Sequence, residues 1–140
     1  MGYTIIVTIK ESTADKYWLV EKAVSHAGTW VLDGQEVLNL DFSATCGSLR
    51  FMNPPGRNNF IVTFGIEQEK PWVAIEADLA PTQTCVEFIP TYFTPGTTQS
   101  GKREFAAPEV GNRDGAGVIV HAKITSFQGT TFWADLDISN

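Results

Sequence analysis

The amino-acid sequence predicts an all-β protein, an antiparallel sandwich or barrel forming a single domain over residues 1–140. Two observations carry this prediction. Short runs of alternating or β-branched residues recur about every 8–12 residues with turn residues between them, a spacing typical of sandwiches and barrels. The composition, 43% hydrophobic and 19% charged, is that of an ordinary globular chain, and the length suits one core.

The expected strands follow one another along most of the chain. Alternation or a short apolar run predicts them at residues 3–10, 17–24, 29–32, 36–42, 48–52, 60–66, 72–79, 118–125 and 131–138. Within the second, residues 21–23 would also suit a helix. Asp33-Gly34 lies between two β-prone runs and predicts a hairpin, because such a turn needs positive φ. Residues 43–47 and 111–117 are expected to be loops of small residues.

Residues 60–79 contain the most apolar pair of expected strands and predict a central β-hairpin. Alternate side chains of a strand point to opposite faces, so each run presents an apolar row. The break from Glu67 to Pro71 supplies two acids, an amide and a base. Polar side chains at the tip of a rigid hairpin are well placed for binding.

Between residues 81 and 107 the alternation stops, and a small helical connection is expected. A Thr cap and Pro81 near the first turn favour a short helix over residues 82–89, which Pro90 ends. Residues 91–101 are expected to be irregular, and residues 102–107 to form one helical turn.

Charge and composition exclude several classes of partner. The net charge of −6 disfavours nucleic acid and anionic membranes, which it would repel. No basic segment precedes an apolar run at the start of the chain, and no run is long enough to span a bilayer, so a cytoplasmic protein is expected. Cys46 and Cys85 are too few for a disulfide framework; free thiols are expected, and one bridge stays open.

The catalytic and metal-binding candidates are weak. His26 and His121 have no metal-ligand spacing, and no cofactor is expected. Glu76 and Asp78, two residues apart on one strand face, could form the acid/base pair of a glycoside hydrolase, or simply a solvated face. Cys46 could be a nucleophile, but no pattern places a base beside it. The sequence therefore predicts a protein that is not an enzyme.

The aromatic residues point to a different activity. Four Trp, three Tyr and nine Phe exceed what one small core needs. Trp133, on a strand face with Thr131 and Asp135, is a candidate for exposure. An exposed aromatic ring beside polar groups is a common way of binding sugars, because the CH groups of the sugar pack on the ring.

Four blocks of residues carry a resemblance to a known family. They are Gly28-Thr29-Trp30, Gly47-Ser48-Leu49-Arg50-Phe51, Thr63-Phe64-Gly65-Ile66 followed by Trp72, and Asp78-Leu79. In these residues and their spacing the chain resembles the fungal fruit-body lectin family over nearly its whole length. The resemblance implies an actinoporin-like antiparallel β-sandwich with a short helix–loop–helix connection around residues 81–107. It also implies binding of glycans and glycoproteins without catalysis, accumulation in the cytosol, and a homotetramer.

The resemblance also implies two sugar sites. The first, for galactose-β1,3-N-acetylgalactosamine or N-acetylgalactosamine, falls on Ala27, Gly28, Cys46, Gly47, Glu67 and Gln68. Glu67 and Gln68 stand where the family has His-Asn and can still bond hydroxyls. Cys46 stands where the family has Ser, a better hydrogen-bonding partner.

The second site, for N-acetylglucosamine, falls on Ala74, Ile75, Glu76, Ala77, Lys102 and Arg103. The family's Asp, Thr and Tyr are missing here, since Ala74, Ala77 and Pro108 stand at those positions. We expect this second site to be lost, or rebuilt around Glu76 and Arg103.

A membrane-binding, cytolysin-like protein of the same fold is the alternative. Such toxins insert an N-terminal amphipathic helix and dock by a basic, aromatic patch. Because this acidic chain begins directly with an expected strand, the sequence favours a lectin without membrane insertion.

Overall fold

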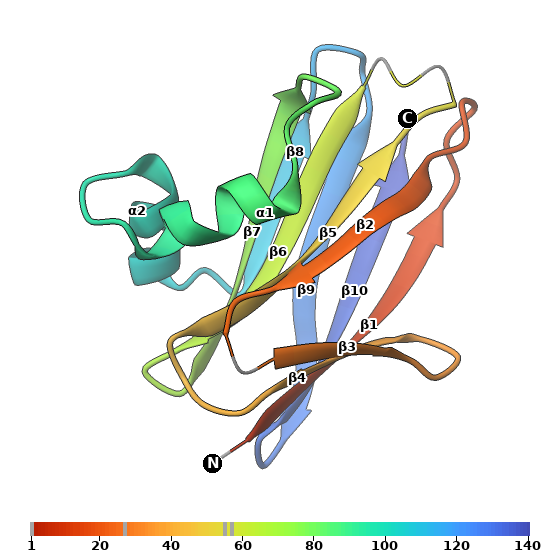
Figure 1. Ribbon diagram of the computed structural model, residues 1–140. Coiled ribbons are helices and arrows are strands. Elements are labelled where there is room, and N and C mark those ends of the chain that lie inside the picture. The colour runs from red at the N-terminus through yellow and green to blue at the C-terminus, as the bar shows by residue number, and fades with distance from the viewer. Residues whose placement is uncertain (1, 27, 55, 57) are drawn as a thin grey trace.

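A computed structural model of the protein describes every residue except 1, 27, 55 and 57, and shows two β-sheets packed face to face (Figure 1). The predicted sandwich is confirmed. The strands are β1 (Tyr3–Glu11), β2 (Trp18–Val24), β3 (Gly28–Leu32), β4 (Glu36–Leu40), β5 (Thr45–Met52), β6 (Asn59–Glu67), β7 (Lys70–Leu79), β8 (Glu109–Arg113), β9 (Ile119–Gln128) and β10 (Thr131–Ser139). The helical connection consists of α1 (Cys85–Phe88), the 3-10 helix η1 (Ile89–Phe93) and α2 (Thr98–Phe105).

The two sheets differ in size and topology. The larger has the order β3-β4-β1-β10-β9-β8, and the smaller has the order β2-β5-β6-β7. Neighbouring strands run antiparallel except β1 and β10, which are parallel, with Ile5 beside Phe132. The arrangement is therefore not purely antiparallel, because the first and last strands meet in the middle of the larger sheet.

Strand β6 is buried on both faces. Its inner row, from Phe60 to Ile66 at every second residue, faces the larger sheet and belongs to the main core with Ile5 and Leu38. Its outer row includes Ile61, which packs beneath the helical connection. The hairpin predicted at residues 60–79 is thus the centre of the fold, covered by a sheet on one side and helices on the other.

A second hydrophobic cluster explains why the helices sit where they do. Trp72 on the outer face of β7 packs against Tyr92 of η1, with ring centroids 5.2 Å apart. A Cβ at Gly65 would lie 2.5 Å from the Trp72 ring, so this glycine makes room for the indole. Figure 1 shows the helical connection crossing the outer face of the smaller sheet, with α2 beyond the edge strand β7.

The turn of the central hairpin is shorter than the sequence predicts. Glu67 pairs with Lys70, which leaves only Gln68 and Glu69 as the loop, both at positive φ (49° and 67°). Pro71 lies within β7, opposite Ile66. β7 is an edge strand, and in a two-residue hairpin this pair falls between the hydrogen-bonded ones, so the missing N–H of Pro71 costs no ladder bond.

Three other boundaries differ from the sequence-based expectations. Thr45 to Gly47 belong to β5 and are not a loop; at Gly47 a Cβ would lie 2.5 Å from Leu38 Cδ1, so the small residue is required by packing. Residues 109–113 form β8, where a glycine-rich loop was expected to begin. Helix α2 begins at Thr98, four residues before the expected turn, because Thr97 caps it by accepting a hydrogen bond from Ser100 N at 3.0 Å.

Candidate functional site

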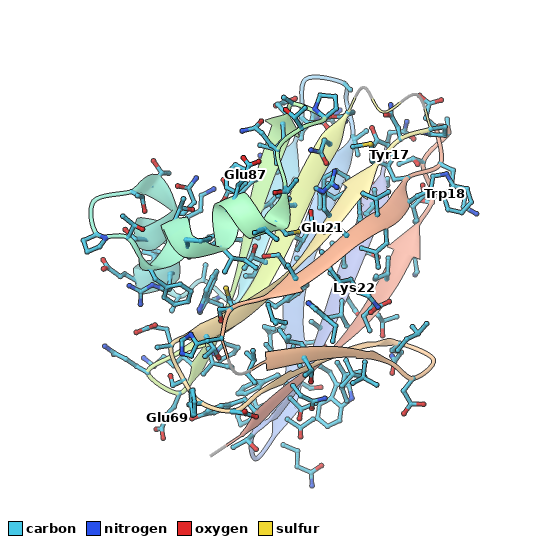
Figure 2. All side chains as sticks on the ribbon, in the orientation of Figure 1. Tyr17, Trp18, Glu21, Lys22, Glu69 and Glu87 are labelled. Carbon is cyan, nitrogen blue, oxygen red and sulfur yellow. The ribbon has the colours of Figure 1, made fainter. Side chains whose placement is uncertain are left out.

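Three connections meet at one end of the sandwich. The β4–β5 loop contacts the hairpin tip where the Glu69 amide donates to Ser43 Oγ at 3.3 Å. The rings of Phe42, in the same loop, and His26, in the β2–β3 turn, lie 5.9 Å apart. Figure 2 shows Glu69 at this end, far from Trp18. Polar and aromatic side chains therefore gather on loops held by a rigid sandwich, the usual setting of a binding site.

A polar hollow of about 220 Å³ lies between the hairpin tip and α2. Its lining combines carboxylates, an amide, an ammonium group and an aromatic ring, from Glu67, Gln68, Lys70, Glu104, Phe105 and Ala106. Phe105 is 83% exposed, so its ring is available to a ligand. This mixture of donors, acceptors and a ring suits a polyhydroxylated molecule.

The Glu67 carboxylate is held in place by an arginine from α2. Its Oε1 accepts from Arg103 Nη1 at 2.6 Å, and Arg103 Nε donates to Tyr92 O at 2.6 Å. The guanidinium also lies 5.2 Å from the centroid of the Phe93 ring. The fold thus joins Glu67, from the first expected sugar site, with Arg103, from the second.

The remaining residues of the first expected site are placed differently. Gly28 is half-buried at the start of β3, and Ala27 lies outside the described residues. Cys46 and Gly47 are buried in β5, so the Cys46 thiol does not face solvent and Gly47 presents no exposed surface to a ligand. Burial raises the pKa of the Cys46 thiol to about 12, which keeps it protonated at neutral pH. The geometry contradicts a nucleophilic role for Cys46; Cys85 is likewise buried, and both thiols are free.

Glu76, the centre of the expected rebuilt second site, is a buried clamp. It is 8% exposed, and Lys102 Nζ lies 3.0 Å from both of its carboxylate oxygens. The Tyr92 hydroxyl donates to it at 2.7 Å and Gln99 Nε2 at 3.3 Å. Burial, and then the Glu76 charge, raise the pKa of the Tyr92 phenol. The carboxylate ties α2 and η1 to β7 rather than facing solvent, so the second site is not rebuilt around Glu76 and Arg103.

Other members of the second expected set also lie within the fold. Ala74 and Ile75 are buried on opposite faces of β7, one in each hydrophobic cluster. Ala77 is partly buried against the main core. Lys102 donates to the backbone oxygen of Ile75 at 3.1 Å as well as to Glu76.

The hydrolase pair is separated by an irregularity in β7. The register of β6 and β7 shifts beside Glu76, and Asp78 takes a left-handed conformation with φ of 55°. Its Oδ1 accepts from Gly115 N at 2.8 Å, whereas Glu76 faces α2. The two carboxylates therefore serve different contacts and do not form a catalytic pair.

The histidines are also apart. His121 Nε2 lies 2.6 Å from Glu109 Oε2, and His26 packs on Phe42. In the described part of the chain, no three His, Cys, Asp or Glu side chains form a group that could hold a metal ion. None of the described helices is both long enough and apolar enough to cross a membrane.

Sequence reasoning placed the exposed tryptophan wrongly. Trp133 is half-buried, whereas Trp18 is 53% exposed, with Lys16 Nζ 4.7 Å from its ring centroid. It also missed Glu104 and Phe105 as lining residues. Thr97 is a favourable N-cap residue, and a helix predicted to begin after it would have placed Glu104 and Phe105 on its last turn. The signal that could have revealed these two residues was therefore the Thr97 cap.

Comparison with known proteins supplies the context for this geometry. Residues 1–136 match the model of the family described as fungal fruit body lectin. The Boletus edulis lectin is 28% identical over 145 residues, covering 99% of this chain and 100% of that protein. The crystal structure of the wild-type Xerocomus chrysenteron lectin superposes with a TM-score of 0.91 at 27% identity, covering 99% of this chain and 100% of the other. A mutated form of that lectin gives a TM-score of 0.91 at 28% identity, covering 99% of both chains.

Proposed function

Because the chain belongs to the fungal fruit body lectin family and is thus a carbohydrate-binding lectin, we propose that it binds glycans ending in galactose or N-acetylgalactosamine in the polar hollow at the β6–β7 tip. One observation carries the proposal: Arg103 fixes Glu67 at the edge of a hollow that Gln68 also lines. A preset carboxylate and a neighbouring amide can bond vicinal hydroxyls without first being ordered.

The lining of the hollow also favours a neutral ligand. Glu67 and Glu104 are acidic, and Lys70 is the basic residue among the described lining. A sialic acid carboxylate would find the neighbouring Arg103 already paired with Glu67 and Glu104, whereas hydroxyl groups can bond to either carboxylate. The proposal is therefore of an uncharged terminal hexose or N-acetylhexosamine, bound without catalysis.

We further propose that the protein works as a multivalent homotetramer in the cytoplasm. A small hollow of about 220 Å³ offers few contacts to a single sugar. Several copies on one assembly would raise the avidity for a multiply glycosylated surface without any new contact. Light scattering on the purified protein tests this: a monomer would contradict the assembly, but not the sugar site.

The experiment is a mammalian glycan array with free N-acetylgalactosamine and N-acetylglucosamine as competitors, followed by titration of the best ligand. Gln68→Ala and Glu67→Ala are expected to weaken binding about tenfold or more, since each removes polar partners of the sugar. Glu87→Ala is the matched control, because this exposed glutamate lies on α1, away from Glu69 at the hairpin tip (Figure 2).

The results of the array and of the two hairpin variants separate the proposed sugar site from its alternatives. Binding that N-acetylgalactosamine abolishes, and that both hairpin variants weaken, supports the proposal. Unchanged affinity in both variants would contradict the site, even if glycans bind. If no glycan binds, the protein is tested for dye release from sphingomyelin liposomes. Release would favour the membrane-binding alternative, and no release would contradict it.

A further inference from the structure

A second hollow lies along the outer edge of β7. It has a volume of about 410 Å³ and is lined by Val73, Ala74, Ile75, Thr98, Gly101, Lys102, Phe105, Ala107 and Val110. Most of these side chains are aliphatic or aromatic. We call it the apolar hollow, to distinguish it from the polar hollow at the hairpin tip.

The two hollows share a wall. Phe105, at the end of α2, lines both, and its side chain is 83% exposed. An aromatic ring so exposed leaves apolar surface in water at the boundary between a polar and an apolar recess. Phe105 is the lining residue that the two hollows have in common in the described part of the chain.

The apolar hollow carries no uncompensated charge among its described lining residues. Lys102 is the ionic member, and its ammonium lies 3.0 Å from both oxygens of Glu76 and 3.1 Å from Ile75 O. A charged group entering the hollow would lose water and find no free counterion. The recess therefore suits an uncharged, apolar group.

The neighbouring strand edge has backbone groups that are already paired. Val73 N donates to Ala107 O at 2.9 Å, and Ile75 O accepts from Lys102. A peptide adding to this edge would need those groups free for main-chain hydrogen bonds. The hollow thus offers side-chain surface to a small apolar group rather than a place for an added strand.

We propose that the apolar hollow is an aglycone subsite, which takes the aryl or alkyl group attached to the sugar in the polar hollow. Phe105 would contact the sugar on one side and its apolar substituent on the other. The inference rests on the proposed sugar site, and it adds a ligand class: glycosides with apolar aglycones, which free sugars and methyl glycosides do not represent.

The test is calorimetric titration of the full-length protein with methyl, 4-nitrophenyl and n-octyl N-acetylgalactosaminides. Burial of the larger aglycone is expected to strengthen binding about tenfold over the methyl glycoside. The aryl and alkyl arms separate a preference for a ring from a preference for a hydrocarbon chain, such as that of a glycolipid.

Gly101→Leu is the decisive variant. A Cβ at Gly101 meets no atom within 4 Å, so a leucine here can enter the hollow without a clash. Leucine also favours helix over glycine, so the fold should survive. Loss of the aryl and alkyl advantage, with methyl glycoside affinity within about twofold of wild type, is the expected result. Gly101→Ala, which adds one methyl group, should retain most of the advantage.

The possible results separate the two proposals. If the methyl glycoside binds but no larger aglycone improves on it, the aglycone subsite is overturned and the sugar site stands. If Gly101→Leu keeps the full advantage, the aglycone lies elsewhere and the inference is overturned. If no glycoside binds the wild-type protein, both proposals fall together.

Discussion

Two carboxylates of the same hairpin meet neighbouring cations of α2 and end in different roles. Glu67 pairs with Arg103 at the hairpin tip and keeps 18% of its side chain exposed, beside the polar hollow. Glu76 pairs with Lys102 further along β7, is 8% exposed, and is also bonded by Tyr92. The difference teaches that residue type alone does not decide whether a carboxylate is available to a ligand; the number of its partners within the protein does.

The physical reason is the cost of removing charge from water. A carboxylate as buried as Glu76 is stable only with its oxygens satisfied by the protein, so few lone pairs remain for a ligand. Glu67, whose carboxylate is bonded by Arg103 and which has a solvent-facing hollow beside it, is oriented yet accessible.

The largest effect is expected for Glu76→Ala. The change removes the acceptor of the buried Tyr92 hydroxyl and the Lys102 ion pair between α2 and β7, so the free energy of unfolding should fall by about 2–3 kcal/mol. Urea unfolding at neutral pH measures it. Glu67→Ala is the comparison and should cost about 1 kcal/mol or less, because that pair is nearer the surface. Equal losses of stability in the two variants would contradict the conclusion that Glu76 has the larger structural role.

Tyr92→Phe should cost about 1–2 kcal/mol at neutral pH by removing a buried hydrogen bond to Glu76. The cost should shrink in alkali. Because the folded pKa of this phenol is raised above its ordinary 10.0, its contribution is present below pH 10 and is lost as pH rises beyond it. Stability of the wild type and the variant, compared at pH 8 and pH 11, checks the sign; a constant gap would refute the assignment.

Arg103→Lys should separate binding from stability at the first carboxylate. Lysine keeps the charge but cannot bond Glu67 and Tyr92 O together through a planar guanidinium. We expect glycan affinity to fall about threefold to tenfold, with a stability loss of about 1 kcal/mol or less. Parallel calorimetry and urea unfolding give both numbers, and unaltered affinity would mean that Glu67 needs no positioning.

The smallest change in stability is expected for a substitution within α2, directly before the two cations that bond Glu76 and Glu67. Gly101 lies inside α2, where a Cβ meets no neighbouring atom, so Gly101→Ala should raise the free energy of unfolding by about 0.5–1 kcal/mol. Thermal unfolding by circular dichroism would register it. A decrease would show that α2 needs the freedom of glycine in order to dock its two cations.

The sequence predicted most strands and missed the local exceptions. Alternation correctly indicated β1, β6, β7 and β10, because those strands bury a regular row of side chains. Thr45 to Gly47 looked like a loop because small residues are common in turns. They form a strand because Gly47 fits beneath Leu38, a constraint that arises from the opposite sheet.

The candidate site was also predicted only in part, because some of its residues are brought together by contacts between distant segments. Glu67 and Gln68 could be predicted because a hairpin tip exposes its polar residues, and both line the polar hollow. The sequence could not show that Arg103 turns toward Glu67 and Lys102 toward Glu76. Adjacent residues of a helix point in different directions, and only the docking of the helix decides which partner each one meets. Glu104 and Phe105 were missed along with the true start of α2.

By itself, the sequence determined the all-β class, the central hairpin, the helical connection and, through its blocks of residues, the family. These depend on short-range periodicity and turn chemistry, which local residues specify. Only the tertiary structure decided which polar side chains are fully bonded within the protein and which remain accessible to a ligand. Burial and pairing there depend on contacts between segments 26 to 36 residues apart in the chain, as between Glu76 and Lys102 and between Glu67 and Arg103.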